Sequence, residues 1–540
     1  MRWISSPDPL PRRETPTSRA LALLAGVVLL HAILAWLSRI PALSWGEDDA
    51  AYILLAQQLR HFGYRELQDI AAPIHARFPP GYPLIIALLG WPFHDSVDAL
   101  LALNIGFTAA TIVLLYLAAR RHLGDAIALI LAALFALNPT SLWDSGHIMA
   151  EAPFKCLMML GLWALSEEDR GAKYSAIAGA AIIGAALTRS AGLVLLPALF
   201  TYWVLQRRYR HAALFAVASA LTVGLWTGWA LVAPDPEHRR LYVSDIGLAG
   251  PRRPRGAFLG DILGRIPSRV RRLATIVFPT ALGLPVIRGT LVDNVAWLLL
   301  VTVLGASGTI VLWRRWRAAA LLALFYGGLL VIWRYSDERF ANPLVPLLLA
   351  AMLVGADWLA RRYASRYRVA LLAMLSALLM LGASRVVSVR LRDALGCDRA
   401  IPMDDQACWS PEYRAYLQAA RWVRDSTPAA AIFFVNKERG FYMHSARRTI
   451  NQDRVLQEDS LSLAPFLRSR GATHAVIAPV GTRSDRHNFL LAQACRDFVV
   501  LREFPMATVV VRLREATDPA NDDGACRALL PYRALRPTRR

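Results

Sequence analysis

Long apolar blocks alternate with short polar stretches through the first 384 residues of the chain. Many of these blocks are about 17–22 residues long, enough for an α-helix to cross a hydrocarbon core about 30 Å thick. The pattern predicts a polytopic α-helical membrane protein with about eleven spans. The expected spans are residues 21–37, 97–118, 125–143, 152–166, 174–188, 191–206, 211–232, 291–312, 318–333, 341–359 and 369–384.

Positive charge is distributed unevenly between these spans. Alternate short connections are rich in Arg and Lys: 120–121, 170–173, 207–210, 314–317 and 361–368. Two intervening connections, 146–150 and 188–190, contain only Arg189. Because positively charged short connections stay in the cytoplasm, we predict a multi-pass inner (plasma) membrane protein with a cytoplasmic N-terminus. The C-terminal domain is then extracytoplasmic, on the periplasmic side.

Three segments on the expected outer side are long: residues 38–96, 233–290 and 385–540. In the first of them, residues 50–60 and 78–91 form short apolar or amphipathic runs. Because neither run is long enough to span comfortably, we expect both to lie as helices at the membrane interface.

The pattern changes after residue 384. Short β-branched and aromatic runs, which are typical of strands, occur at 431–435, 472–480, 498–504 and 507–513. Helices are expected at 411–426 and near 459–470 and 486–496. The first of these helices is preceded by Ser410 and begins with Pro411, a combination typical of a helix start.

This change divides the chain into two expected domains. Residues 1–384 form a transmembrane domain, which includes the loops 38–96 and 233–290. Residues 385–540 form an extracytoplasmic α/β domain. Its tail after about residue 515 is polar and is expected to be loose.

The composition agrees with a membrane protein. Hydrophobic residues make up 55% of the 540 and charged residues 19%, whereas a soluble protein would carry about 25% charged residues. The net charge of +21 comes mostly from arginines at span ends, where topology and anionic headgroups explain it. Since no recognised nucleic-acid-binding module is present, we expect membrane lipids and no nucleic acid as partners.

The cysteines suggest an oxidising environment for the C-terminal domain. Of the five cysteines, four lie in the last 150 residues, where they can form two disulfides. Three pairings are possible, and free thiols are a further alternative. Proximity favours Cys397–Cys408, which leaves Cys495–Cys526 as the second pair. Cys156 lies in an apolar segment and is expected to be a packing residue.

Carboxylates gather at the expected outer face. Glu47, Asp48 and Asp49 follow the first span, and Glu151 begins the fourth span from the same side. Carboxylates beside lipid tend to be functional, and like charges this close raise at least one pKa toward that of a general base. We therefore expect Asp48, Asp49 and Glu151 to share a pocket. The alternatives are a solvated acidic loop and, at Glu151, an acid that complements the helix dipole.

Cations are expected at the same face. Arg189 follows the fifth span and Arg339 precedes the tenth. Arginine holds phosphate through paired hydrogen bonds, and a lipid phosphate would lie at this depth. The alternative for each is a membrane anchor whose charge reaches the interface. His147 lies in the same connection as the start of the fourth span, where a histidine is more often an interface residue than a ligand.

Four short motifs resemble the GT-C class of membrane glycosyltransferases, such as the protein O-mannosyltransferases and the lipid A aminoarabinose transferase. They are an acid pair followed by an aromatic, a Pro-Pro-x-Tyr-Pro stretch, a Glu-Pro-Phe-like element and an Arg-Tyr-x-x-Pro element. They fall on Asp48-Asp49 with Tyr52, on 79–83 with Tyr82, on 151–154, and on 339–343 with Phe340 in place of Tyr. The resemblance covers roughly the whole chain, and the order and placement of the motifs carry it.

The resemblance implies an inverting transfer in which Asp48 deprotonates or orients the acceptor. Asp49 and Glu151 would support that base, and Arg189 and Arg339 would stabilise the leaving polyprenyl phosphate. Tyr52, Tyr82 and His147 are the residues expected to position the substrate.

Two departures from the class concern single residues. Relatives often carry Lys or His directly before the Pro-Pro stretch, where this chain has Phe78. We therefore take the neighbouring Arg77 as a third candidate for binding the donor phosphate. The additional acid Glu47 leaves open which carboxylate is the base.

The sequence thus predicts a hexosyl- or pentosyltransferase that uses a polyprenyl-phosphate-linked sugar. The acceptor is a lipid, a glycan or a protein at the outer face, and neither a cofactor nor a metal is expected to be required. One alternative is a transporter or flippase of lipid-linked sugars, for which we see no internal repeats. The other is a non-catalytic membrane assembly factor.

Overall fold

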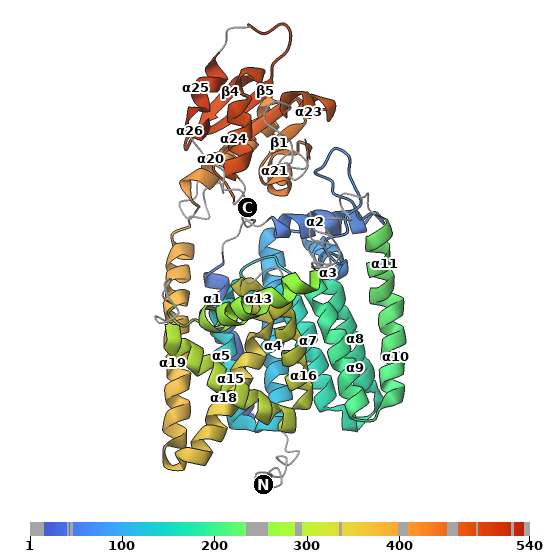
Figure 1. Cartoon of the computed structure of the whole chain (residues 1–540), viewed down its shortest axis with the longest axis vertical. Coiled ribbons are helices and arrows are strands. Elements are labelled where there is room, and N and C mark those ends of the chain that lie inside the picture. The colour runs from blue at the N-terminus through green and yellow to red at the C-terminus, as the bar shows by residue number, and fades with distance from the viewer. Residues whose placement is uncertain are drawn as a thin grey trace. The chain divides into compact units, whose positions relative to one another are not determined.

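The computed structural model describes residues 16–39, 43, 47–233, 258–286, 294–333, 337–397, 409–450, 463–481, 484–519 and 523–533. The chain forms two compact units (Figure 1). The helical unit combines residues 1–39 with 75–392, and the α/β unit combines residues 40–74 with 393–540.

Each predicted span coincides with helical structure. The helices concerned are α1 (Ser18–Leu37), α4 (Val97–Leu123), α5 (Asp125–Ala136) with α6 (Pro139–Ser145), α7 (Glu151–Ser166), α8 (Ala172–Thr188), α9 (Leu195–Leu205), α10 (Tyr209–Ser219) with α11 (Leu225–Val232), α15 (Val295–Arg315), α16 (Arg317–Ile332), α18 (Val345–Tyr363) and α19 (Arg368–Leu395). By length and composition, six described helices can cross a membrane, and seven can if the α5–α6 pair counts as one span. The protein is therefore a multi-pass membrane protein, and the count of eleven stays a prediction.

The third predicted span is bent by 58° between α5 and α6. Asn138 accepts a hydrogen bond from the Thr140 amide (2.8 Å), and Pro139 occupies the first turn of α6. This is a helix start, because proline suits the first turn and its ring is incompatible with a helix interior. The short α6 then leads through residues 146–150 into α7.

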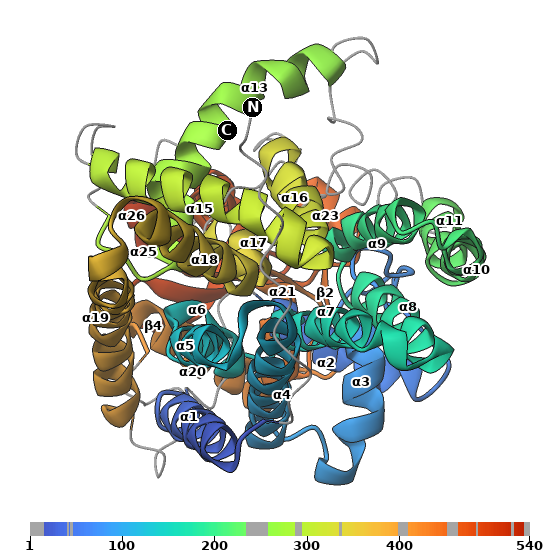
Figure 2. The same cartoon turned by 90° about the horizontal axis from the view of Figure 1, so that it is seen from below.

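Close packing of small residues brings the helices of this unit together. Figure 2 shows α4, α7 and α8 side by side, and these helices make contact in the order α4–α7–α8. A Cβ added at Gly308 on α15 would overlap the Ala351 carbonyl of α18, and one at Gly355 would overlap the Leu304 carbonyl. Such close backbone approach is typical of helices packed in a membrane. It fixes α18 and the short segment that precedes it.

The α/β unit is built on a five-stranded sheet in the order β2-β1-β3-β5-β4. Strands β1 (Phe433–Val435), β2 (Thr449–Ile450) and β3 (His474–Ile477) are parallel, and β4 (Phe498–Phe504) and β5 (Thr508–Leu513) are antiparallel. All four predicted strands are present, and the two-residue β2 was missed because it has no periodicity to detect. Helices α20 (Pro411–Ser426), α23 (Leu463–Ser469) and α24 (Ser484–Gln493) match the expected helices, and Ser410 caps α20.

Part of the first long loop belongs to the α/β unit, whereas we expected it in the transmembrane domain. The Ile70 amide donates to the Thr449 carbonyl at 3.0 Å, and the Thr449 amide donates to the Gln68 carbonyl at 2.7 Å. Residues 68–70 thereby pair with β2, whose outer edge would otherwise have unpaired backbone groups.

The two short helices of this loop differ in position. Helix α2 (Asp48–Leu59), which belongs to the α/β unit, is buried along residues 49–56, whereas an interfacial helix would expose one face. Helix α3 (Gly81–Leu89), in the helical unit, covers most of the expected run 78–91, and a 3₁₀ turn follows it at Trp91–Phe93.

The C-terminal tail is packed, so the expectation of a loose tail is wrong for residues 523–533. Helices α25 (Gly524–Ala528) and α26 (Leu530–Arg533) bury Ala525, Leu529 and Tyr532 in the core of the unit. The predicted Cys495–Cys526 disulfide is confirmed and ties α25 to this core. Cys397 is disulfide-bonded, and its expected partner Cys408 lies outside the described residues.

Candidate active site

The carboxylate of Glu151, the first residue of α7, is fully buried between two arginines. Its Oε1 lies 2.5 Å from Arg339 Nε and 3.1 Å from Arg189 Nη1. The side chains of Arg339 and Arg189 are 29% and 10% exposed. The cluster therefore has one positive charge in excess inside the helical unit, and it is suited to bind an anion.

Two polar atoms of this cluster are buried without a hydrogen bond among the residues that the structure describes. They are Glu151 Oε2, because both arginines approach Oε1, and Arg189 Nη1, whose contact with Oε1 is an ion pair without hydrogen-bond geometry. Buried polar groups in folded proteins are normally satisfied. The two atoms are therefore places where a bound ligand can donate or accept.

The arginines are positioned by short irregular segments. Arg189 has an extended backbone between α8 and a 3₁₀ turn at Ser190–Val194, and Arg339 lies in α17 (Glu338–Ala341). The Arg189 guanidinium lies 5.4 Å from the centre of the Phe340 ring, and Tyr326 donates to the Phe340 carbonyl at 3.1 Å. Phe340 thus packs against one arginine and is the sequence neighbour of the other, which keeps both beside Glu151.

A second buried contact lies one helical turn further along α7. Lys155 and Asp144 form an ion pair in which both side chains have no exposed surface. Asn342 Nδ2 donates to the other Asp144 oxygen at 3.3 Å. Glu151 and Lys155 are four residues apart and face the same side. Helix α7 is thus linked to the segment 339–342 at two levels, directly through Glu151 and through Asp144 at Lys155.

Tyr82 and Asn104 hold the connection that leads into α7. The Tyr82 hydroxyl donates to Asn104 Oδ1 at 3.1 Å. Asn104 Nδ2 donates to the carbonyls of His147 and Met149, at 2.5 and 3.3 Å. Tyr82 is thus part of a buried network, and its expected role in positioning substrate stays a prediction.

The Pro-Pro-Gly-Tyr-Pro stretch also packs closely against the end of α8, directly before Arg189. A Cβ at Gly81 would lie 2.6 Å from the Leu187 carbonyl oxygen, two residues before Arg189. A glycine is required here because any side chain would push α3 away from the end of α8.

His147 and Arg77 take no part in the Glu151 ion pairs. The His147 ring stacks on Trp143 with centroids 4.2 Å apart, and its Nδ1 lies 2.7 Å from the Trp143 carbonyl. Arg77 is exposed, with its guanidinium 5.7 Å from the Phe78 ring. Among the described residues Glu151 pairs with Arg189 and Arg339, so the proposed phosphate-binding role of Arg77 gains no support from this cluster.

The acids of the first loop belong to the α/β unit. Asp49 is 1% exposed and accepts from the Ala50 amide at 2.8 Å, and Tyr52 is 3% exposed. Burial raises the pKa of Glu47, while the charges of Arg439 and Lys437 act in the opposite direction. Because these acids and Glu151 lie in different units, their expected convergence stays a prediction.

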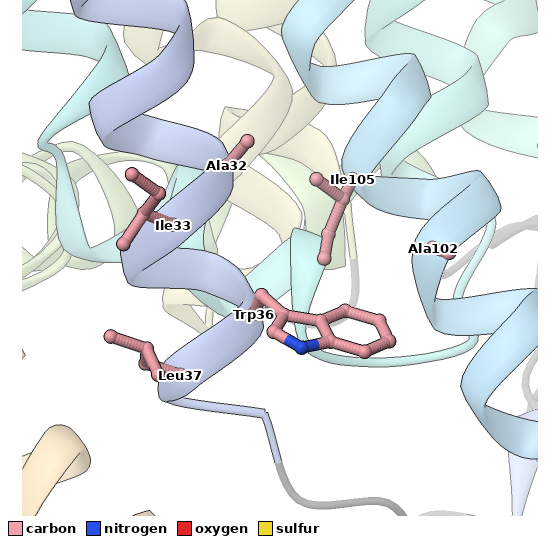
Figure 3. Close-up of a pocket in the computed structure, with 6 residues that line it drawn as sticks. All are labelled: Ala32, Ile33, Trp36, Leu37, Ala102 and Ile105. Carbon is pink, nitrogen blue, oxygen red and sulfur yellow. The ribbon is translucent and has the colours of Figure 1, made fainter.

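Two further features of the described residues bear on the chemistry. No group of three or more His, Cys, Asp or Glu side chains in these ranges is arranged to hold a metal ion, and the expected metal independence stays a prediction. Figure 3 shows a cleft between α1 and α4 whose lining has no ionisable side chain: Ala32, Ile33, Trp36, Leu37, Ala102 and Ile105. This cleft offers no group for acid–base chemistry.

The sequence interpretation missed Asn104, Asp144, Lys155 and Asn342. A signal existed for Lys155, because a lysine inside an expected span is costly unless it is paired. The amides gave no signal, since their partners are backbone carbonyls and a carboxylate from distant segments.

Residues 77–233 match the family model of dolichyl-phosphate-mannose-protein mannosyltransferases. A search of curated protein sequences finds no match. Solved structures do match over nearly the whole chain, at sequence identities that show the fold alone. The segment that matches the family model includes Arg77, Tyr82, His147, Glu151 and Arg189.

Two solved proteins illustrate the structural match. ArnT from Cupriavidus metallidurans is 16% identical in its apo state, with a TM-score of 0.57 over 92% of this chain and 98% of that one. Its complex with undecaprenyl phosphate gives 15% identity and a TM-score of 0.54, over 93% and 100%. The oligosaccharyltransferase AglB from Archaeoglobus fulgidus, in complex with an inhibitory peptide and a dolichol-phosphate, is 14% identical with a TM-score of 0.53, over 94% and 76%. The chain therefore has the fold of the GT-C membrane glycosyltransferases, as its motifs predicted.

Proposed function

We propose that the protein is an inverting glycosyltransferase that moves a hexosyl or pentosyl group from a polyprenyl-phosphate donor to an acceptor at the outer face of the membrane. The observation that carries the proposal is the buried Glu151 cluster, in which two arginines share one oxygen of one carboxylate. A net positive, desolvated group of this kind suits a lipid phosphate.

The transfer needs no redox partner and no nucleotide. The acceptor oxygen forms a bond to the anomeric carbon of the sugar as the bond from that carbon to the phosphate oxygen breaks. The bonding electrons stay on the phosphate, and the acceptor proton passes to a carboxylate, for which we propose Asp48. Arg189 and Arg339 stabilise the phosphate as its charge grows, which lowers the barrier because that charge is largest in the transition state.

Two further observations support the donor class and the orientation. ArnT and AglB, which share the fold, have been solved with undecaprenyl phosphate and with a dolichol-phosphate. The positive connections at 120–121, 207–210 and 361–368 favour a cytoplasmic location for that face, which leaves the Glu151 end of α7 outside.

The test uses the full chain in lipid nanodiscs with radiolabelled mannosyl- and arabinosyl-phosphoryl undecaprenol. We expect lipid-dependent release of undecaprenyl phosphate and transfer of label to an acceptor in a membrane extract. Asp48→Asn should abolish transfer. Asp518→Asn, which removes a carboxylate paired with Arg512 in the same unit, serves as the matched control and should leave transfer unchanged.

Two results would end the proposal. One is unchanged transfer by the Asp48→Asn protein, intact in the membrane. The other is movement of the lipid-linked sugar across sealed vesicles without any transfer, which is the result expected of a flippase.

A further inference from the structure

Two helices of the α/β unit begin at charged residues with left-handed backbone. Helix α2 follows Glu47 (φ 61°), and α21 (Glu438–Ser445) follows Lys437 (φ 63°). The side chain of neither residue caps its own helix. Non-glycine residues rarely adopt this conformation, and they keep it where the surroundings hold them in place. The two helices, both labelled in Figure 1, contact each other although almost 400 residues of chain separate them.

The side chain of Glu47 caps α21 instead. The first amide bonded within α21 is that of Phe441, which donates to the Lys437 carbonyl at 2.9 Å. The Gly440 amide precedes it and needs an acceptor from outside the helix. Glu47 Oε1 accepts this bond at 3.2 Å. A carboxylate at a helix N-terminus both satisfies the amide and complements the helix dipole.

The start of α21 also binds the first loop at a second place, Glu66. Arg439, next to Gly440, lies 3.4 Å from Glu66 Oε1, and the two side chains are 15% and 7% exposed. The other Glu66 oxygen accepts from Gln68 at 2.8 Å, and the Gln68 carbonyl accepts from the Thr449 amide at 2.7 Å. The loop is thus fixed on both sides of α2, which carries Asp48 and Asp49.

We propose that Glu47 is a positioning residue that tethers the start of α2 to the N-terminus of α21. The C-terminal domain then contributes to the reaction by holding Asp48 and Asp49 in place. The proposal rests on the proposed function and assigns different roles to the three consecutive acids. Glu47 is the tether, and Asp48 and Asp49 are left for the chemistry.

The first test compares Glu47→Ala with Glu47→Gln in the full chain. Alanine removes the acceptor of the Gly440 amide and thereby frees the start of α2. Because Asp48 is then misplaced, we expect kcat to fall by about 100-fold, while the KM for the donor stays within about twofold of wild type. The glutamine oxygen still accepts the Gly440 amide, so kcat stays within about tenfold of wild type. Asp518→Asn is again the control within the same unit.

The second test approaches the contact from the other side. Gly440→Ala keeps the amide, and its Cβ would lie 3.8 Å from Glu47 Oε1, an ordinary contact. Gly440→Pro removes the donor in the first turn, where proline breaks no bond within the helix. We expect the alanine variant to behave as wild type and the proline variant to lose kcat as Glu47→Ala does.

Hydrogen exchange of the amides at 438–441 and 48–52 reads the tether without activity. Exchange should be faster in Glu47→Ala and unchanged in Glu47→Gln and in Asp48→Asn. If wild type transfers no sugar from any donor, the proposed function fails, and this exchange alone decides on the tether. The proposal would be overturned if the Glu47→Ala protein had the same amide exchange rates and the same kcat as wild type. So would an equal loss of kcat in Glu47→Gln and Glu47→Ala, because Glu47 would then act through its charge.

Discussion

Among the clusters of one carboxylate and two arginines in the described part of the helical unit, those around Asp357 and Glu151 differ in geometry. Asp357 on α18 pairs through Oδ2 with Arg361 Nε (2.9 Å) and through Oδ1 with Arg368 Nε (2.5 Å). These arginine side chains are 46% and 36% exposed. Glu151, by contrast, meets Arg189 and Arg339 through one oxygen, and its second oxygen has no hydrogen bond among the described residues.

We interpret this difference as the one between a structural anchor at Asp357 and the proposed binding site at Glu151. The Asp357 cluster satisfies both carboxylate oxygens and comes from residues within 11 positions of one another. It therefore fastens the end of α18 to the start of α19, with its two arginines partly exposed. The Glu151 cluster brings together three distant segments, and two of its buried polar atoms have no hydrogen-bond partner in the described part of the chain. Such an arrangement does not maximise stability, and unsatisfied buried groups are often explained by function.

Replacing the central carboxylate should separate the two clusters most strongly. Glu151→Gln removes the carboxylate with which both arginines pair, so we expect transfer to fall about 1000-fold while undecaprenyl phosphate binds at least as tightly as to wild type. Asp357→Asn should change transfer by less than about threefold. Initial transfer rates and equilibrium binding in nanodiscs measure both quantities.

The opposite behaviour of binding and transfer is the informative part of this prediction. Glu151→Gln protein that loses lipid-phosphate binding together with transfer would show that Glu151 is needed to fold the site. Equal losses of transfer in the Asp357→Asn protein would remove the distinction between the clusters.

The buried Asp144–Lys155 pair should sharpen the comparison through stability. Asp144→Asn leaves a charged lysine inside the helical unit, and we expect a loss of about 3–5 kcal/mol in the free energy of unfolding. Replacing both residues, as Asp144→Leu with Lys155→Met, should recover most of it because no unpaired charge remains. Asp357→Asn should lower the free energy of unfolding by about 1 kcal/mol at most.

Unfolding in mixed detergent micelles with increasing dodecyl sulfate measures these differences. If Asp144→Asn is as stable as Asp357→Asn, the lysine finds water or another partner, and the pair does not hold α7 against residues 339–342.

Tyr82→Phe should have the smallest effect. The change removes one donor to Asn104, for which we expect a loss of about 1 kcal/mol of stability and a change in transfer within about threefold. A rise of tenfold or more in the KM for either substrate, at unchanged stability, would instead support the substrate-positioning role that the sequence predicts for Tyr82. Steady-state kinetics with the donor and the acceptor varied in turn distinguish these outcomes.

Much of the fold could be predicted because its signals are local. Apolar length identified every helix of the expected spans, and β-branched runs identified β1, β3, β4 and β5. The Ser410-Pro411 signal placed the start of α20 at the correct residue. Each of these depends on neighbouring residues alone, which is why pattern and propensity were sufficient.

The remaining features depend on contacts between distant segments. Nothing near Gln68 indicates that it pairs with Thr449, and nothing near Asp144 indicates Lys155 or Asn342 as partners. The tail was expected to be loose because its polar residues outnumber Ala525, Leu529 and Tyr532, which are spaced to face one side. For the candidate site, the sequence placed Glu151, Arg189 and Arg339 at the same membrane face, and the structure shows the three side chains in contact.

The most direct test of the central claim is the dissociation constant of undecaprenyl phosphate for Arg189→Met and Arg361→Met proteins in nanodiscs. Each substitution removes one arginine from a cluster of the same composition. The account predicts that Arg189→Met weakens binding by about 10–100-fold, because the buried hydrogen bond from Arg189 to the lipid phosphate is lost. For Arg361→Met it predicts binding within about twofold of wild type. Wild-type affinity in the Arg189→Met protein, or equal weakening in both, would contradict the assignment of the Glu151 cluster as the lipid-phosphate site.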